Sequence, residues 1–169
     1  MVSILVVFWM YVALFAVIGA MRGWAKEILV TASVIVALTF STLLEHYVQF
    51  VRDAIAHQSV ALFWLRTLIL VILVFFGYQT PNIARFAPKM TREKFQDVLL
   101  GVFLGLVNGF LIAGSVWFYL HNSNYPFSFI KAPETTPLIL NYLAPRLLGV
   151  PAIYFAVVVA FIFVIVVFI

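Results

Sequence analysis

The stretch DVLLGVFLGLVNGFLIA, from Asp97 to Ala113, decides the fold of this chain. Gly101, Gly105 and Gly109 repeat every four residues within it. Asp97 and Ala113 continue the same register, so all five residues fall on one stripe of a helix. In water such glycines would weaken a helix, but in a bilayer they let a neighbouring helix approach closely, because packing drives association there. The stretch therefore predicts a central packing helix, with these small residues as helix-packing positions.

The composition of the chain is that of a membrane protein. Of its 169 residues 66% are hydrophobic and 9% are charged, whereas about a quarter are charged in soluble domains. The apolar runs are continuous over about the 20 residues that a spanning helix needs, unlike the alternating strands of outer-membrane barrels. We therefore predict an all-α, polytopic helical membrane protein with the lipid bilayer as its surroundings.

Several function classes are excluded by the residues that the chain lacks or spreads out. There is no cysteine, so disulfides, thiol chemistry and cysteine-ligated metals are excluded. The formal charge is +4, but the basic residues stand singly in loops between apolar runs, which does not fit a nucleic-acid-binding face. No nucleophile–base arrangement, phosphate-binding loop or metalloprotease signature is present, so we predict neither an enzyme nor a cofactor.

Five apolar runs predict about five transmembrane helices in a single membrane domain covering residues 1–169. The runs are 2–20, 28–44, 60–78, 97–120 and 151–169. Residues 45–58 have helical spacing of apolar side chains and are expected to continue the second helix along the interface. The connection 123–150 contains several prolines, with a short interfacial helix expected near 138–148. Thr91 is expected to cap the fourth helix.

The distribution of Lys and Arg predicts the orientation. Six lie on the side of the first and third connections: Arg22, Lys26, Arg85, Lys89, Arg92 and Lys94. Four lie on the other side: Arg52, Arg66, Lys131 and Arg146. By the positive-inside rule, the N-terminus is predicted to lie outside.

Polar residues inside the runs have two interpretations each. The hydroxyls of the second run can line a polar path, but the favoured interpretation is that they bond to carbonyls of their own helix. They are Thr31, Thr39, Ser41 and Thr42. Arg66 is expected to extend to the nearby interface, and the alternative is an ion pair with an acid on another helix.

Arg22 and Glu27 are five residues apart around Gly23, which is free to adopt a positive φ. We expect them to form a pair that fixes the angle between the first two helices, while the alternative is a headgroup or partner contact through Arg22 and Lys26. Asp97 and Asn108 are further candidates, because ionisable and amide groups are rare in membrane helices.

His46, Asp53 and His57 are spaced so that one helix brings them roughly to one side. Imidazole and carboxylate groups suit zinc or iron. A solvated polar face of an interfacial helix explains the same residues, and we favour that interpretation over a metal site.

Two motifs resemble the colicin V production protein (CvpA) family of bacterial inner-membrane proteins. The first is GAMRGWAKE, from Gly19 to Glu27, which is similar to the family's glycine, arginine–glycine and glutamate pattern. The second is DVLLG, from Asp97 to Gly101, leading into the glycine ladder. The resemblance covers about residues 1–122, and it implies a cytoplasmic-membrane protein linked to toxin production or export and to envelope maintenance, without enzymatic activity.

The chain departs from that family pattern at two positions and at its end. The family usually has an arginine directly after the acid and another before the third glycine, where this chain has Val98 and Asn108. The region after Asn122, with its extra apolar run 151–169, is unlike the family's polar tail. These departures favour an alternative, a small structural accessory subunit packed against other subunits of a respiratory or photosynthetic membrane complex.

Overall fold

The computed structural model describes residues 3–49, 51, 60–79, 94–127, 130, 138–147, 155–159 and 162. Its elements are α1 (Ile4–Arg22), α2 (Trp24–Tyr47), α4 (Val60–Tyr78), α5 (Lys94–Asn122), the 3-10 helix η1 (Leu138–Tyr142) and α6 (Ala144–Leu147). All regular structure in these ranges is helical, which confirms the all-α prediction.

Among the residues that the structure describes, four helices are long and apolar enough to cross a membrane: α1, α2, α4, and α5 from Phe95 onward. They coincide with the first four apolar runs, so the chain is a multi-pass membrane protein. The fifth predicted run, 151–169, lies mostly outside the described residues, and only 155–159 and 162 are described as helical. The fifth crossing therefore stays a prediction.

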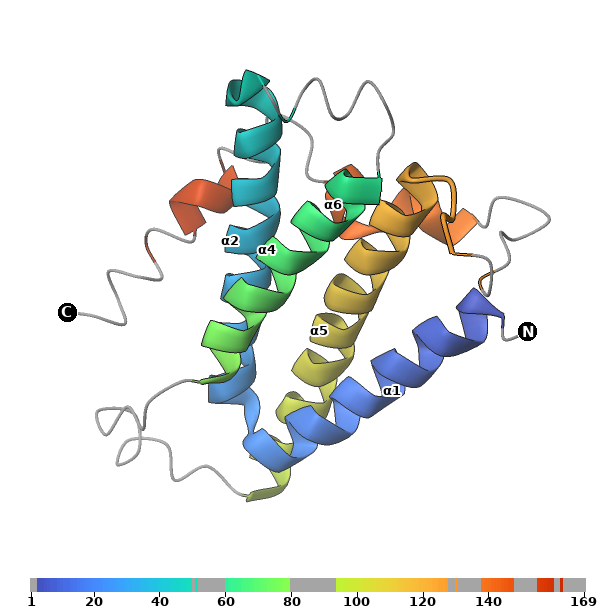
Figure 1. Cartoon of the computed structure of the whole chain (residues 1–169). Helices are drawn as coiled ribbons and strands as arrows, with labels where there is room; N and C mark the ends of the chain where they lie inside the picture. Colours follow the sequence, from blue (N-terminus) through green and yellow to red (C-terminus); the bar gives the residue numbers. More distant parts are fainter. Residues whose placement is uncertain are drawn as a thin grey trace.

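The long helix α5 is in contact with each of the other three long helices. In Figure 1 it runs between α1 on one side and α2 with α4 on the other. α1 packs mainly along α5 and approaches α2 near their junction, whereas α2 packs against both α4 and α5. Residues on α5 can therefore link elements that do not pack closely on each other.

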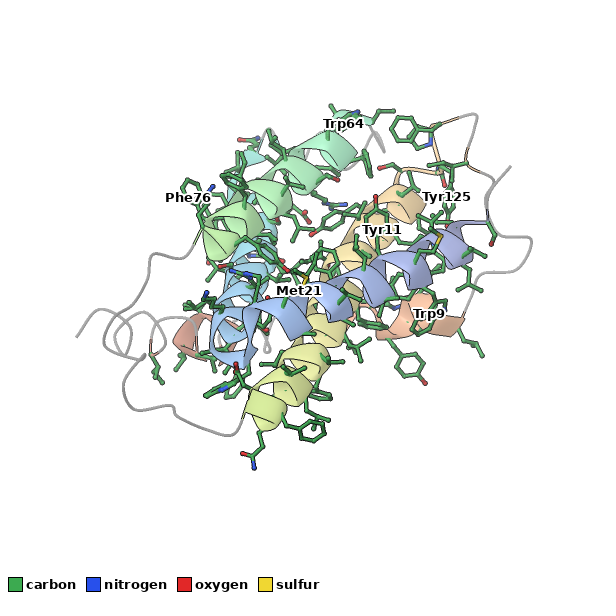
Figure 2. All side chains as sticks on the ribbon, turned by 90° about the horizontal axis from the view of Figure 1, so that it is seen from below. Trp9, Tyr11, Met21, Trp64, Phe76 and Tyr125 are labelled. Carbon is green, nitrogen blue, oxygen red and sulfur yellow. The ribbon has the colours of Figure 1, made fainter. Side chains whose placement is uncertain are left out.

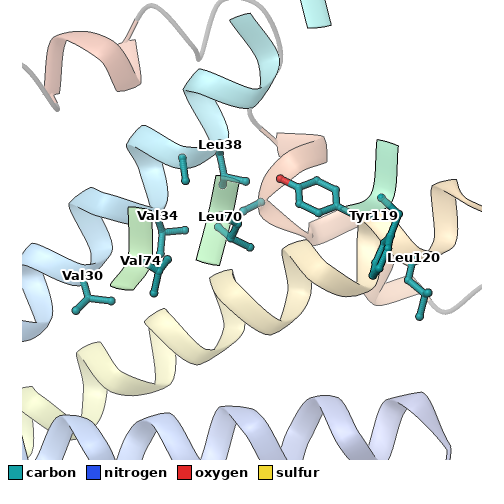
Figure 3. Packing of buried hydrophobic residues seen from close by; sticks show 10 residues of the cluster. Val30, Val34, Leu38, Leu70, Val74, Tyr119 and Leu120 are labelled. Carbon is teal, nitrogen blue, oxygen red and sulfur yellow. The ribbon is translucent and has the colours of Figure 1, made fainter. Parts of the chain in front are cut away.

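Two apolar clusters fill the spaces between the helices. The larger lies among α2, α4 and α5, and Figure 3 displays its side chains, including Val34, Leu38 and Leu70. The second joins Phe8 of α1 and Trp117 of α5 to η1 and the start of α6. α5 contributes residues to both clusters, because it lies between α1 and the other two long helices. The sides of the helices that take no part in the clusters are left to face lipid.

The remaining sides of the helices carry large apolar residues on the outer surface. Trp9, Met21 and Phe76 are labelled in Figure 2 and are 51%, 83% and 67% exposed. On a soluble monomer, contiguous patches of this kind would mark an interaction site, but a hydrocarbon environment covers them without cost. The surface therefore agrees with the membrane assignment.

Three predicted boundaries are wrong in detail. The first connection is the single residue Gly23, because helical geometry continues up to Arg22 and resumes at Trp24. α2 ends at Tyr47 and Val48 has extended geometry, so the expected continuation over 45–58 is interrupted there; residues 50 and 52–59 lie outside the described ranges. The expected helix near 138–148 is divided into η1 and α6.

Candidate functional site

The junction between α1 and α2 requires glycine for two separate reasons. Gly23 has φ 82° and ψ 158°, a conformation that side chains with a Cβ rarely adopt. A Cβ built on Gly23 would also lie 2.7 Å from a carboxylate oxygen of Asp97. The positive φ expected from the sequence is confirmed, and the close approach of α5 is a second constraint.

Asp97 supplies from α5 the cap that α2 lacks. Its Oδ1 accepts a hydrogen bond from the backbone N–H of Trp24 at 3.3 Å. Gly23 occupies the N-cap position and has no side chain with which to accept that bond. A carboxylate at this place also interacts favourably with the positive end of the helix dipole. Asp97 therefore fixes the start of α2 from a distance of more than seventy positions in the sequence.

Glu27 is completely buried beside this junction, with both carboxylate oxygens bonded. Its Oε1 lies 2.8 Å from Nη1 of Arg22, and its Oε2 accepts a hydrogen bond from Nδ2 of Asn108 at 2.9 Å. The other guanidinium nitrogen of Arg22 donates to the carbonyl oxygen of Tyr78 at 3.1 Å, and the guanidinium carbon lies 4.3 Å from the Tyr78 ring centroid. The expected Arg22–Glu27 pair is present.

Asn108 completes the network with its remaining groups. Its Nδ2 also donates to the backbone carbonyl of Glu27 at 3.0 Å, and Thr31 Oγ1 lies 2.7 Å from Asn108 Oδ1. We call Arg22, Glu27, Thr31, Tyr78 and Asn108 the Glu27 cluster. Its five residues come from α1, α2, α4 and α5, so one polar cluster ties together the four long helices. A buried network whose members are paired rigidifies a fold.

The glycine stripe of α5 lies directly against α1. Gly19 and Gly101 approach so closely that a Cβ on either one would overlap the backbone carbonyl of the other. A Cβ on Gly105 would overlap the carbonyl of Phe15, and one on Gly109 would lie 2.9 Å from Val12 Cα. Ala113 packs against the second apolar cluster. The interface is thus formed largely by backbone atoms.

A second ion pair lies toward the other end of α2. Nε of Arg66 lies 2.5 Å from Oε1 of Glu45, and the guanidinium carbon is 5.5 Å from the ring centroid of Tyr119 on α5. We call Glu45, Arg66 and Tyr119 the Glu45 cluster. Arg66 is 8% exposed, so the expected extension to the interface is wrong and the alternative ion pair is correct. Burial explains this, because an arginine withdrawn from water needs a partner.

An apolar layer separates the two clusters. Val30, Val34 and Val74, seen with Leu38 and Leu70 in Figure 3, are buried between them. Most hydroxyls of α2 bond to carbonyls of their own helix, as expected: Thr31, Thr39 and Thr42 do so, and Ser33 behaves likewise. Ser41 is the exception, because its buried Oγ makes no bond to a carbonyl of its own helix and interacts instead with Tyr119 of α5. The described part of the bundle is therefore built to hold helices together, without a continuous polar path.

Sequence reasoning missed three members of these clusters, namely Tyr78, Glu45 and Tyr119. The backbone carbonyl of Tyr78 leaves no signature in the amino-acid type, and Glu45 was expected in a continuation of the second helix along the interface. Of the three residues considered as metal ligands, His46 lies at the exposed end of α2, while Asp53 and His57 lie outside the described residues. The expected cap Thr91 also lies outside them. Among the described residues, no group of three or more potential metal ligands occurs.

The two motifs that carry the family resemblance meet in space. Arg22 and Glu27 come from the first, Asp97 and Gly101 from the second, and Asn108 from the ladder that follows. The family model for the colicin V production protein matches residues 4–132. The chain belongs to this family. The matched region runs from α1 to just beyond α5 and so contains both clusters.

No match is found among curated proteins or solved structures. Membership of the colicin V production family therefore rests on the family model together with the geometry of the motifs. Asn108, which stands where the family pattern usually has an arginine, donates a hydrogen bond to the Glu27 carboxylate. The amide thus supplies a donor toward Glu27 without adding a second positive charge.

Proposed function

We propose that this chain is a non-enzymatic protein of the bacterial cytoplasmic membrane that acts in toxin production or export or in maintenance of the envelope. The observation that supports the proposal is that both family motifs meet at the junction of α1 and α2, where Asp97 of the second motif bonds to Trp24 of the first beside the Glu27 cluster. A cluster that joins four helices defines a scaffold, and the same scaffold is expected wherever the family pattern occurs. The bundle itself offers no arrangement for bond-making chemistry among the described residues.

The test uses a bacterial strain that lacks its own copy of the gene and produces a secreted peptide toxin. We expect loss of the gene to lower secreted toxin activity or to raise sensitivity to detergent, and the intact chain to restore both. Glu27→Gln should fail to restore them, because it removes the anion that holds Arg22. Lys26→Gln, on the same turn but exposed, is the matched control and should restore them. A strain that is indistinguishable without the gene in both assays would overturn the proposal.

The orientation proposed with this function places the N-terminus outside, from the six-to-four distribution of Lys and Arg. Since the chain has no cysteine, single cysteines can report the side of each loop. Cysteines replacing Val2, Ala87 and Ile130 should react with an impermeant reagent from outside, inside and outside respectively. Reaction of position 87 from outside would reverse the assignment.

The second candidate is an accessory subunit of a larger membrane complex. It is supported by the aromatic and apolar side of α5 that α1, α2 and α4 leave uncovered, including Phe95, Leu99 and Phe103. Affinity purification after mild solubilisation separates the two candidates. Stoichiometric partner chains with haem or pigment absorption would favour the accessory role, and deletion of residues 151–169 should then release the protein. A monomer or homo-oligomer without a chromophore favours the envelope role.

A further inference from the structure

Residues 138–147, which form η1 and α6 and which we call the wedge, lie against the side of α5 and not beyond its end. Leu140, Leu143 and Ala144 of the wedge are buried. A Cβ built on Gly114 of α5 would lie 2.8 Å from Cδ2 of Leu143, so Leu143 fills the space that a larger residue at position 114 would take. Figure 1 draws α6 beside the upper part of α5, with which it is in contact.

The lengths of the helices place the wedge at the edge of the hydrocarbon. The apolar part of α5 has 28 residues, which is about 42 Å, whereas the hydrocarbon core is about 30 Å thick. An upright, centred α5 therefore extends about 6 Å beyond the core at each end. Gly114 precedes the last residue of α5, Asn122, by about 12 Å along the helix. The side chain of Leu143 consequently reaches about 6 Å into the hydrocarbon.

The exposed side of the wedge combines large apolar side chains with one charge. Leu138, Tyr142 and Leu147 are 78%, 65% and 60% exposed. Arg146, next to Leu147 on α6, is also exposed. At this depth acyl chains cover the apolar side chains, and an arginine among them extends its guanidinium toward the phosphate layer. A tyrosine suits the same level, because one end of its ring is apolar and the other is polar.

The Arg146 guanidinium has no ion pair with an acid among the residues that the structure describes. Glu27 and Asp97 hold the junction of α1 and α2, toward the start of α5. Glu45 is paired with Arg66. A cation at the edge of the hydrocarbon needs an anion, because removal from water penalises an uncompensated charge. The anion that a bilayer presents at this level is the phosphate of its lipids.

We propose that the wedge is a binding site for an anionic phospholipid. Arg146 holds the phosphate, since a guanidinium can donate to two of its oxygens at once. The three exposed apolar side chains of the wedge lie along the acyl chains. The buried side of the wedge packs on both Phe8 of α1 and Trp117 of α5, so a lipid held on the exposed side supports the contact between these two helices.

The test titrates phosphatidylglycerol into the full chain in a neutral detergent, with an environment-sensitive fluorophore on Asn141→Cys. The chain has no other cysteine, and Asn141 is exposed within the wedge. We expect Arg146→Gln to weaken the apparent affinity about fivefold, the contribution of one basic residue near an anionic membrane surface. Lys26→Gln is the matched control, because it removes an exposed charge at the junction of α1 and α2, and it should leave the affinity unchanged.

Two further titrations separate the lipid from its parts. Inorganic phosphate supplies the anion without acyl chains, and diacylglycerol supplies the chains without the anion. Neither should change the fluorescence at the concentration at which phosphatidylglycerol saturates it. Equal affinity of the wild type and Arg146→Gln for phosphatidylglycerol, or an equal response to either part alone, would overturn the proposal.

The depth of the wedge is measured independently with spin labels in lipid nanodiscs. Labels on Leu138→Cys and Leu147→Cys should be more accessible to oxygen than to a water-soluble nickel chelate. A label on Asn122→Cys, exposed at the end of α5, should show the opposite preference. If the labels on the wedge behaved like the label at position 122, the wedge would lie in water and the lipid site would be wrong.

Discussion

The two ion-pair clusters use the same residue types and differ in how completely they are enclosed. The Glu27 carboxylate is fully buried, and each of its oxygens has a partner from a different helix. The Glu45 side chain is 24% exposed, and its pair with Arg66 is formed through Oε1. Glu27 lies in the first turn of α2, where three other helices meet it, whereas Glu45 lies near the end of α2. The two clusters therefore differ in how deeply the carboxylate is buried, and not in the type of ion pair.

The largest loss of stability is expected from neutralising the buried Glu27 carboxylate. Glu27→Gln leaves the Arg22 guanidinium without its counter-charge, and breaking a buried pair in this way typically costs about 3–5 kcal/mol. Thermal unfolding in a mild detergent, followed by circular dichroism, measures the loss. The double variant Arg22→Gln with Glu27→Gln should recover part of it, because no unpaired charge remains. Equal destabilisation by the single and double variants would mean that the charge pairing is unimportant.

The equivalent substitution in the Glu45 cluster should lower the free energy of unfolding by a smaller amount. Glu45→Gln keeps an amide oxygen beside Arg66, and the Glu45 side chain is already 24% exposed in the native protein. We expect a loss of about 1.5–3 kcal/mol, the range for hydrogen bonds to charged groups. If Glu45→Gln destabilised the protein as much as Glu27→Gln in the same assay, enclosure would not explain the difference between the clusters.

The backbone contacts beside the Glu27 cluster can be tested by a bulky side chain. Gly105→Leu forces α1 away from α5, because even a Cβ would overlap the carbonyl of Phe15, and overpacking costs about 1–3 kcal/mol. Ala13→Leu is the matched control, since Ala13 is on the exposed side of α1. An unchanged melting temperature for Gly105→Leu would show that this contact does not stabilise the bundle.

The smallest loss of stability is expected from removing the cap that Asp97 provides for α2. Asp97→Ala removes the acceptor for the Trp24 N–H, and loss of a helix cap costs about 0.5–2 kcal/mol. Asp97→Asn retains an acceptor oxygen and should recover most of the loss in the same unfolding measurement. If both variants melted alike, the negative charge near the helix dipole would be the main contribution instead of the hydrogen bond.

Much of the fold could be predicted because it depends on local pattern. Apolar runs of spanning length locate α1, α2, α4 and α5, and the bond between Arg22 and Glu27 joins residues only five apart. What could not be predicted depends on which helices meet. Nothing in the spacing indicates that Asp97 caps α2 or that Asn108 reaches Glu27, and these contacts decide the site.

The ion pair of Arg66 likewise could not be predicted from the sequence pattern alone. An arginine near the end of an apolar run has the same sequence context whether it reaches the interface or pairs inside. The choice depends on whether an acid on another helix stands within reach, and Glu45 does so because α2 and α4 lie side by side.

The single-residue joint at Gly23 has a consequence for how the chain enters the membrane. With helical residues on both sides of it, the two helices have no slack and must be inserted as one hairpin. Arg22 and Glu27 travel together in that hairpin, so their charges offset each other during the transfer into lipid. The acceptor that caps the second helix and the amide that completes the pair both lie on α5, which is synthesised later. Assembly of the junction therefore waits for the last of the four described long helices to arrive.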